Sequence, residues 1–458
     1  MLNDANIAAF RAGLHGGLIE PGDPRYDAAR KVYNGMIDRR PRLIARCADV
    51  ADVIAAVRFG REQNLLVAVR GGGHNACGLG VCDDGLVIDL SQMNYVRVDA
   101  RKKTVLVGGG ALWRDVDHAT HAFGLAVPAG IISTTGVAGL TLGGGIGYLT
   151  RRYGLTIDNL LAVEMILADG RFITASAKEN ADLFWAVRGG GGNFGVVTAF
   201  LFKGRPVHTD YGGPMLWPMA DAAEVMRWYR NFIAKAPDDV YGFFAFHTVP
   251  PWPPFPDHLY NKKMCGIVWC YTGPIKKAEK VFKPIRNFKT PALDLVGPIP
   301  HPALQSMFDR LYPPGMQWYW KADFVRALPD EAITVHLKHA AKLPTTESTM
   351  HLYPVNGAAS RVKNSATPWC HRDATWAAVI VGVGSDPANK EKISGWAKQY
   401  WSELHPYSSG GAYVNFMMEE GEDRIRATYG QNYKRLAKIK KRYDPSNFFR
   451  VNQNIKPI

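Results

Sequence analysis

The stretch Val69-Arg70-Gly71-Gly72-Gly73-His74-Asn75-Ala76-Cys77-Gly78 organises the chain. It continues an apolar run, 65–69, that is typical of a buried β-strand. Three consecutive glycines carry no Cβ atoms, so the backbone N–H groups of such a turn can close around an anion. His74 stands directly at the edge of the turn. The pattern predicts a strand that ends in an anion-binding loop. Taken alone, it is also compatible with an ordinary surface turn that carries a histidine.

The segments on either side of this turn predict a sheet with short connections. A strand at 41–46, an amphipathic helix that starts at Asp49 and the strand at 65–69 give the order strand, helix, strand, glycine turn. Short strands at 86–90, 95–98 and 104–107 predict an antiparallel or mixed sheet, followed by a helix at 112–123. The dipeptide Asp169-Gly170 predicts a hairpin between 161–167 and 172–175.

A second glycine-rich block spans residues 128–147. It contains seven glycines and no charged residue. A bare surface position does not suit so long an uncharged segment. We therefore expect a buried loop whose backbone wraps a flat apolar ligand. The structural alternative is a loop with no ligand.

A third glycine run, 188–195, fits the spacing GxGxxG at Gly190, Gly192 and Gly195. A nicotinamide-binding fingerprint has a strand before it and a helix after it. Here the predicted helix comes first and the strand, 196–202, follows. The sequence therefore argues against a nicotinamide-binding domain.

Composition places the chain among ordinary globular proteins. It has 458 residues, of which 47% are hydrophobic and 21% charged, enough for two to three domains. No run approaches the ~20 apolar residues of a membrane span. The first residues lack the cationic start of a secretory signal, so we expect a cytoplasmic enzyme. The spacing of the cysteines fits neither a disulfide framework nor a zinc site. We expect free thiols at Cys47, Cys77, Cys82, Cys265, Cys270 and Cys370, and no bound metal.

The formal net charge of +14 raises the question of a polyanionic partner. Lysines and arginines are scattered, however, and the densest cluster, 434–442, has the pattern of the solvated face of a late helix. We therefore expect no nucleic-acid partner. A nucleic-acid or polyanion binder stays as an alternative, which a salt-dependent gel shift without a flavin spectrum would favour.

The character of the chain changes near residue 205. Glycine runs give way to aromatic residues and prolines, and helices at 221–235 and 275–288 separate predicted strands. This predicts an α+β domain, whose aromatic residues form a core or an apolar substrate cavity. Near the C-terminus we expect a strand at 410–416. A basic helix at 429–443 should end at Pro445.

Five segments in order carry a family resemblance: Arg70–His74, 135–147, 152–159, 191–195, and Tyr413-Val414-Asn415 with 444–449. The chain resembles the FAD-linked oxidases of the vanillyl-alcohol-oxidase superfamily, in the berberine-bridge-enzyme-like branch. The resemblance implies an α+β protein of two domains. Residues 1–205 and 414–458 would form the FAD domain. Residues 206–413 would form a substrate domain with a central antiparallel sheet over the flavin ring.

The resemblance also implies a covalent flavin. His74 would be bonded to the 8α-methyl group of the FAD ring, which raises the flavin potential. Many members carry a second link from a cysteine, but that position here is Ile132, so we expect a single link. The FAD-binding residues implied are Val69, Arg70, Gly71, Gly72, Gly73, His74, Asn75, Gly78, Leu79, Pro128, Gly130, Thr134, Thr135, Gly136, Gly139, Leu140, Gly143, Gly144, Gly147, Tyr148, Asn159, Val163, Gly195, Val197, Tyr413 and Asn415.

Tyr413 matches the family tyrosine that acts as catalytic base in several members. A phenol needs a nearby cation or hydrogen-bond donor for this, and Asn415 and Arg152 are the candidates. His371 matches a further family position at the start of a strand of the substrate domain. We therefore take His371, with Tyr413 and Arg152, as a candidate catalytic residue. The strand carries no acid or base at 377–381, so the sequence leaves the base open beyond Tyr413. A core tyrosine that is merely hydrogen-bonded is the alternative.

The function implied is that of an oxidase. It would take a hydride from a C–H next to an alcohol or amine of a small to medium organic molecule, and reduce O2 to H2O2. Three alternatives stay open: a flavin dehydrogenase with poor oxygen reactivity, a natural-product tailoring oxidoreductase, and a flavin-fold binding protein that has lost its chemistry. The sequence does not determine the substrate or the oligomeric state.

Overall fold

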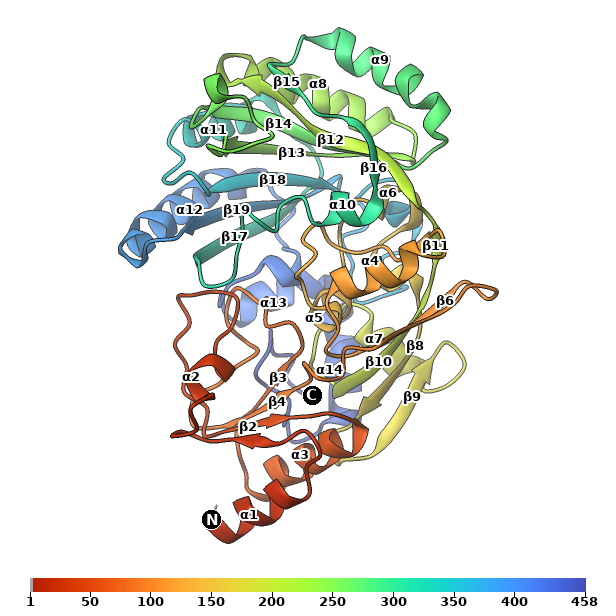
Figure 1. Ribbon diagram of the computed structural model, residues 1–458, viewed down its shortest axis with the longest axis vertical. Helices are drawn as coiled ribbons and strands as arrows, with labels where there is room; N and C mark the ends of the chain where they lie inside the picture. The colour runs from red at the N-terminus through yellow and green to blue at the C-terminus, as the bar shows by residue number, and fades with distance from the viewer. Residues whose placement is uncertain (1–2) are drawn as a thin grey trace.

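The computed structural model describes residues 3–458 and has the predicted α+β architecture in two domains (Figure 1). Both ends of the chain contribute to one of them, which we call the terminal domain. In Figure 1 its red and orange N-terminal segments lie beside the blue C-terminal helices. The large sheet drawn in green to blue, with its helices, forms the central domain. The site described below lies where the two domains meet.

The first sheet of the terminal domain carries the glycine turn. Its order is β1 (Leu18–Ile19), β2 (Leu43–Arg46), β4 (Leu86–Asp89) and β3 (Val67–Arg70). Strands β2, β4 and β3 are parallel, and α3 (Val50–Glu62) connects β2 to β3. Asp49 caps this helix by accepting a hydrogen bond from the Asp52 backbone N–H at 3.0 Å. The predicted order of strand, helix, strand and glycine turn is confirmed.

The second sheet of the terminal domain is antiparallel. Its order is β5 (Val96–Asp99), β6 (Thr104–Gly108), β10 (Val196–Lys203), β8 (Leu160–Ile166) and β9 (Phe172–Ser176). The β8–β9 hairpin turns at Gly170, whose φ of 80° suits glycine, as the Asp-Gly signal predicts. The expectation of one sheet for 86–90, 95–98 and 104–107 is wrong. Strand β4 joins the first sheet, because it pairs with β2 and β3.

Three local predictions need correction. The block at 128–147 is not all loop, because α5 (Val137–Gly143) forms in its middle and ends at Gly144, whose φ is 133°. The expected strand at 410–416 is a turn with a single 3₁₀ element, η8 (Val414–Phe416). The expected helix at 429–443 is present as α14 (Tyr433–Tyr443) but begins later, because the chain turns at Gly430 with a φ of 47°. A separate helix, α13 (Glu422–Tyr429), precedes this turn.

The central domain is built on one antiparallel sheet of eight strands. Their order is β15 (Leu293–Asp294), β12 (Thr209–Pro218), β14 (Lys263–Tyr271), β13 (Val240–Thr248), β18 (Thr349–Pro354), β19 (Trp376–Gly384) and β17 (Gln317–Val325), with β16 (Gly297–Pro300) also on β12. Helices α8 (Ala222–Lys235), α9 (Ala278–Phe288), α11 (Asp330–Ala340) and α12 (Lys390–Leu404) lie on the outer side of the sheet (Figure 1).

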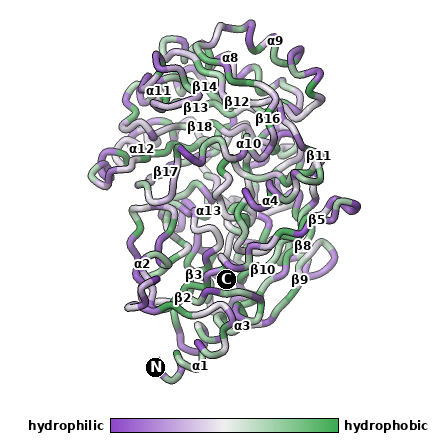
Figure 2. Tube along the Cα trace, in the orientation of Figure 1, coloured by the Kyte–Doolittle hydropathy of each residue, from purple (hydrophilic) through white to green (hydrophobic). Residues whose placement is uncertain are grey.

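Strand β19 shows how the sheet joins the two domains. All nine of its residues are buried. Ala378 and Ile380 pack in the core under the helices, whereas Ala377, Val379 and Val381 pack in the core shared with the terminal domain. This follows from the two-residue repeat of side chains along a strand. Figure 2 shows the same division, with hydrophobic residues along inner strands and hydrophilic residues on outer helices and loop tips.

The C-terminal segment returns to the terminal domain. Tyr413, Met417 and Leu436 pack in the core of the antiparallel sheet, and Phe448 and Phe449 pack against the parallel one. All six cysteines are free and buried, as predicted. Among the residues described, no helix is both long and apolar enough to cross a membrane.

One residue of the basic helix departs from its predicted role. In α14, Lys440 is fully buried, whereas the other basic residues of the cluster face solvent. Its ammonium group donates to Asp444 at 2.7 Å, to the Asn193 carbonyl at 2.6 Å and to the Phe449 carbonyl at 2.8 Å. These contacts join α14, the third glycine run and the C-terminal segment.

Candidate active site

A large cavity lies between the two domains. Its volume, measured as the space open to the centres of water molecules, is about 310 Å³. The two glycine loops of the terminal domain form one side, and strands β17, β18 and β19 form the other. The third glycine run and the C-terminal segments 413–416 and 449–453 complete the wall. Parts of the chain that are far apart in sequence therefore meet around one space.

The two glycine loops touch through their backbones. A Cβ added at Gly72 would lie 2.5 Å from the Gly136 Cα, and one added at Gly136 would lie 2.4 Å from the Gly72 nitrogen. Only glycine fits at these two positions. At Gly139 and Gly192, in contrast, an added Cβ meets nothing within 4 Å, so a side chain there would project into open space. Glycine thus brings the loops together and leaves the cavity clear, as a backbone cradle for an extended ligand requires.

Arg70 is the only cavity-lining residue, within the described chain, that carries a full charge. Arg70 on β3 and Asp89 on β4 are register partners, and the guanidinium donates to the carboxylate at 2.8 Å. Both side chains are buried. Because this charge is already paired, an anion in the cradle would depend chiefly on backbone N–H groups.

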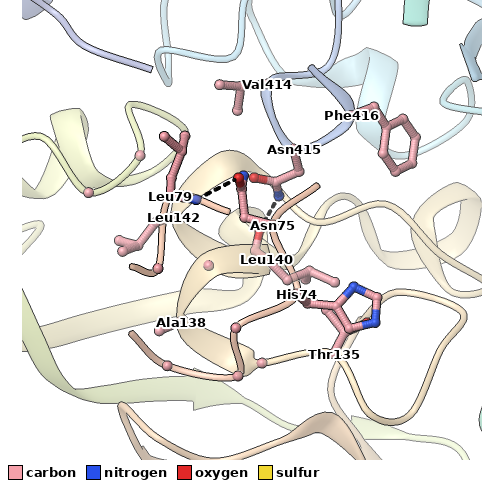
Figure 3. A pocket seen from close by; sticks show the side chains of 18 of the residues that line it. His74, Asn75, Leu79, Thr135, Ala138, Leu140, Leu142, Val414, Asn415 and Phe416 are labelled. Atoms are coloured by element: carbon pink, nitrogen blue, oxygen red, sulfur yellow. Dashed lines mark hydrogen bonds between the residues drawn. The ribbon is translucent and has the colours of Figure 1, made fainter. Parts of the chain in front are cut away.

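His74 points into the space beside the cradle, as Figure 3 shows. Its ring stacks on Tyr33, with 3.7 Å between ring centroids. Within the described residues its buried Nε2 has no hydrogen-bond partner. Burial lowers the pKa of His74 to about 4, so the imidazole is neutral at physiological pH. A neutral, unpartnered ring nitrogen is the form in which histidine acts as a nucleophile.

Asn34 holds this turn against the central domain. Its amide donates to the Ala76 carbonyl at 2.7 Å and to the Trp318 carbonyl at 3.0 Å. The backbone N–H of Trp318 donates back to the Asn34 oxygen at 3.1 Å. The buried amide therefore fixes the distance between the His74 turn and strand β17.

The Tyr413 hydroxyl accepts two hydrogen bonds. The Gly145 backbone N–H and the Asn415 side-chain amide each donate to it at 2.8 Å. Asn415 also donates to the Leu140 carbonyl at 3.1 Å, which ties the segment to α5 (Figure 3). Burial raises the pKa of Tyr413, whereas the two donors oppose that shift because they stabilise a phenolate. The phenol is protonated at rest.

The structure brings many of the predicted FAD-binding residues to the cavity wall and leaves others behind it. Lining the cavity are Val69, Arg70, Gly71, Gly72, Gly73, His74, Asn75, Leu79, Gly130, Thr135, Gly136, Gly139, Leu140, Gly195, Val197, Tyr413 and Asn415. Not lining it are Gly78, Pro128, Thr134, Gly143, Gly144, Gly147, Tyr148, Asn159 and Val163.

Several of the second group hold the wall from behind. Gly78 lies against Ile37, where a Cβ would come within 2.5 Å of the side chain. Gly143 lies against Asn415, where a Cβ would come within 2.1 Å of the amide oxygen. Asn159 accepts a hydrogen bond from Arg205 at 2.7 Å.

The prediction that Arg152 supports Tyr413 is wrong. Its guanidinium lies over the Tyr153 ring and donates to the Thr272 carbonyl, away from the cavity. His371 also lies outside the cavity. Its Nε2 lies 3.1 Å from the Thr428 carbonyl oxygen, and its ring stacks on Phe324. His371 packs against Gly411, and so lies behind the segment that carries Tyr413.

Sequence reasoning missed the central-domain wall and Tyr33. The residues missed include Tyr33, Tyr312, Trp318, Trp320, His351, Tyr353, Asn452 and Gln453. A signal existed for β18, where Thr349, His351 and Tyr353 alternate with the apolar Met350 and Leu352. This is the two-residue pattern of a strand with two different faces.

Ile132 lines the cavity, and within the described chain no cysteine does.

Comparison with known proteins fits this geometry. A family model described as FAD binding domain matches residues 41–176, and one described as berberine and berberine-like matches residues 412–456. An FAD-linked oxidoreductase of Dictyostelium discoideum is 31% identical, over 99% of this chain and 97% of its own length. The chain belongs to the FAD-linked oxidoreductases. The structural neighbours belong to the berberine-bridge-enzyme-like and vanillyl-alcohol-oxidase-type family.

Other relatives and solved structures match this chain over nearly its whole length. The (R)-6-hydroxynicotine oxidase of Paenarthrobacter nicotinovorans is 29% identical over 97% of both chains. The crystal structure of 6-hydroxy-D-nicotine oxidase from Arthrobacter nicotinovorans matches with a TM-score of 0.86 and 26% identity, covering 97% of this chain and 98% of that one. A berberine-bridge-enzyme-like protein of Physcomitrella patens shares the fold, with a TM-score of 0.86, 23% identity and 99% of both chains covered.

Proposed function

We propose that the protein is an FAD-dependent oxidase. It would remove a hydride from a C–H next to an alcohol or amine of a small to medium organic substrate, and reduce O2 to H2O2. The observation that carries the proposal is the convergence in one cavity of two glycine loops, an unpartnered neutral His74 and the twice hydrogen-bonded Tyr413 hydroxyl. The relatives named as oxidases and FAD-linked oxidoreductases support it.

The residues present fit FAD. An extended dinucleotide would lie against the backbones of three segments: Gly71–Gly73, 130–140 and the third glycine run. Glycine suits these segments, because a Cβ atom at several of their positions would clash with neighbouring protein atoms. Bound there, FAD would supply the acceptor for the hydride and would pass the two electrons to O2, which takes up two protons to become H2O2. The substrate carbon would form a double bond to its oxygen or nitrogen as the proton of that hydroxyl or amine group leaves.

His74 would be the single covalent anchor. Its ring nitrogen is neutral, because burial lowers its pKa to about 4, and it is unpartnered. Tyr33 fixes the plane of the ring by stacking. Among the described residues no cysteine reaches the cavity to form a second link, and Ile132 lines it where many family members have that cysteine.

Tyr413 would accept the substrate proton. Its oxygen is held by Gly145 and Asn415, and both donors stabilise the phenolate that accepts a proton. Burial opposes this by raising the pKa of the phenol. The proposed base is therefore favoured by alkaline conditions.

The decisive experiment is spectroscopic. We expect the purified protein to be yellow, and the colour to remain with the pellet after acid precipitation. A colourless protein would remove the basis of the proposal, and a flavin that stays in the supernatant would exclude the covalent link. Oxygen uptake with peroxide formation on a reducing substrate distinguishes the oxidase from a dehydrogenase, in which the flavin bleaches without oxygen consumption.

A further inference from the structure

The cavity offers a substrate no free charge. Among the described residues that line it there is no aspartate, glutamate or lysine, and the charge of Arg70 is paired with Asp89 at 2.8 Å. Asp309 does not line the cavity and accepts a hydrogen bond from the Ser133 backbone N–H at 3.2 Å. A cation that enters this space would leave water without meeting a free carboxylate.

The wall formed by the central domain is aromatic. Trp318 and Trp320 of β17 and Tyr353 of β18 face the cavity, together with Val379 and Val381 of β19. The alternation along each strand places these side chains on the inner face and their neighbours under the outer helices. A flat apolar body fits such a wall.

A neutral polar pair interrupts this wall. His351 Nδ1 and the Tyr353 hydroxyl are hydrogen-bonded, and both residues line the cavity. Burial, with a smaller contribution from His247, lowers the pKa of His351 to about 3, so its ring is uncharged in the physiological range. Because Nδ1 is the ring nitrogen bonded to Tyr353, Nε2 is the nitrogen through which His351 can hydrogen-bond a ligand. The pair therefore has capacity left to donate to, or accept from, a neutral hydroxyl group.

We propose that the substrate is an uncharged, flat alcohol whose hydroxyl group hydrogen-bonds to the His351–Tyr353 pair, and that protonated amines are excluded. The proposal rests on the proposed function and narrows its choice between alcohol and amine. An ammonium group is costly to bury without a counter-ion and carries donors only. A hydroxyl group loses less on leaving water and pairs with a neutral imidazole whichever ring nitrogen carries the proton.

The test compares two probes of the same shape that have no abstractable C–H, cumyl alcohol and cumylamine. Their binding to the flavin-loaded protein is measured by isothermal titration calorimetry at neutral pH, where the amine carries its proton. We expect the alcohol to bind at least ~10-fold more tightly. Tighter binding of the amine, or binding of neither probe, would overturn the inference.

Substitutions at the pair give the second arm. His351→Leu should weaken alcohol binding about 10-fold by removing the polar partner, and Tyr353→Phe, which removes only one hydroxyl, should weaken it less. His351→Glu should reverse the preference towards cumylamine, because it supplies the missing carboxylate. His258→Leu and His258→Glu, at an exposed histidine outside the cavity, are the matched controls. Unchanged selectivity in all His351 variants with intact flavin content would contradict the proposal.

Failure of the proposed function gives a different result. Benzyl alcohol and benzylamine are the oxidisable counterparts, and anaerobic bleaching of the flavin follows their oxidation. Selective binding of cumyl alcohol without bleaching by any alcohol leaves the binding inference standing and removes the oxidase function. Bleaching by benzylamine faster than by benzyl alcohol would overturn the inference while it supports the oxidase.

Discussion

At the scale of single residues, His74 and Tyr413 differ in whether their reactive atom has hydrogen-bond partners. The buried Nε2 of His74 has no partner among the described residues, whereas the Tyr413 oxygen has two donors at 2.8 Å. The free lone pair of the His74 nitrogen can form a covalent bond, and the Tyr413 oxygen, which accepts two hydrogen bonds, can carry a developing negative charge. Each residue thus has the environment that its proposed role requires.

Substitution of His74 by alanine should separate flavin binding from flavin attachment. We expect His74→Ala to retain some FAD in the glycine cradle but to lose all acid-stable flavin, because the proposed anchor is gone. Absorbance of the acid pellet and fluorescence of the protein band on a denaturing gel measure this. His118→Ala, at an exposed histidine, should keep its acid-stable flavin. Acid-stable flavin in the His74→Ala protein would show that another residue is the anchor.

Substitution of Tyr413 by phenylalanine should slow flavin reduction by about 10²–10⁴-fold, the usual contribution of a general base. The wild-type rate should rise towards alkaline pH, because burial raises the pKa of Tyr413 and only the deprotonated form accepts a proton. The variant should lose this rise. Anaerobic stopped-flow reduction across the pH range gives both results. A variant that reduces the flavin at the wild-type rate would show that Tyr413 packs in the core and does not act as a base.

At the scale of elements, the site depends on where α5 ends. Gly144 and Gly145 both have positive φ, which turns the chain so that the Gly145 N–H faces Tyr413. A Cβ at Gly145 would lie 2.0 Å from the Thr156 hydroxyl oxygen. The end of this short helix therefore supplies a donor that no side chain could supply in the same place.

Replacement of Gly145 by alanine should damage stability and rate together. We expect Gly145→Ala to lower the free energy of unfolding by roughly 1–3 kcal/mol, because of the positive φ and the clash with Thr156. Chemical denaturation measures this loss, and the flavin-reduction rate should fall as well. Gly395→Ala, at an exposed position of α12 with open space around it, should instead stabilise by up to about 1 kcal/mol. Equal effects in both variants would contradict this account.

The buried Lys440 links helix α14 to the third glycine run and to the C-terminal segment, both of which contribute residues to the cavity wall. Lys440→Met should lower the free energy of unfolding by about 3–5 kcal/mol, because it leaves the Asp444 carboxylate buried without its partner. Flavin content should also fall, since the Asn193 and Phe449 carbonyls lose a common donor. Lys441→Met, one residue along on the solvent side, is the matched control and should change neither. Guanidinium denaturation and flavin absorbance decide the comparison.

At the scale of the whole molecule, the domains also meet at a buried polar cluster away from the cavity. Asp117 of α4 (Trp113–His121) accepts a hydrogen bond from Gln305 of α10 (His301–Gln305) at 3.5 Å. His301 lies 2.7 Å from Asp210 of β12. Burial raises the pKa of Asp117 to about 7, whereas the charge of His301 and the Gln305 hydrogen bond act to lower it. We therefore expect the stability of this interface to depend on pH.

Stability should follow the ionisation of Asp117. The folded protein holds the Asp117 proton up to about pH 7, whereas the unfolded chain releases it near the ordinary pKa of 3.8. The stabilisation that comes from this difference in proton affinity is therefore complete below pH 3.8 and is lost as the pH rises from there through 7. Asp117→Asn should remove that loss, so the variant should exceed the wild type in melting temperature at pH 8 but not at pH 4. Each tenfold difference in proton affinity between the folded and unfolded chain corresponds to about 1.4 kcal/mol, which bounds the gain. Glu62→Gln, at an exposed carboxylate, should show no such dependence.

The sequence by itself determined the family, the two-domain α+β fold, the glycine loops and the free thiols. These are local or ordered features: consecutive glycines, alternating apolar residues and motifs in a fixed order along the chain. They could be recognised because backbone freedom and side-chain periodicity act over a few residues. The same locality explains the error at 410–416 and the late start of the helix expected at 429–443, where bonds to distant segments and a positive φ at Gly430 override the local pattern.

Only the tertiary structure decided which residues share the cavity. It removed Arg152 and His371 from the wall, and it added Tyr33, Trp318, His351 and Tyr353. The Gly145 N–H that supports Tyr413 lies 268 residues away in sequence, so no spacing rule could predict it. Among the described residues, the lack of a free charge on the cavity wall is likewise a property of the assembled structure, because it depends on which faces of three neighbouring strands point inward.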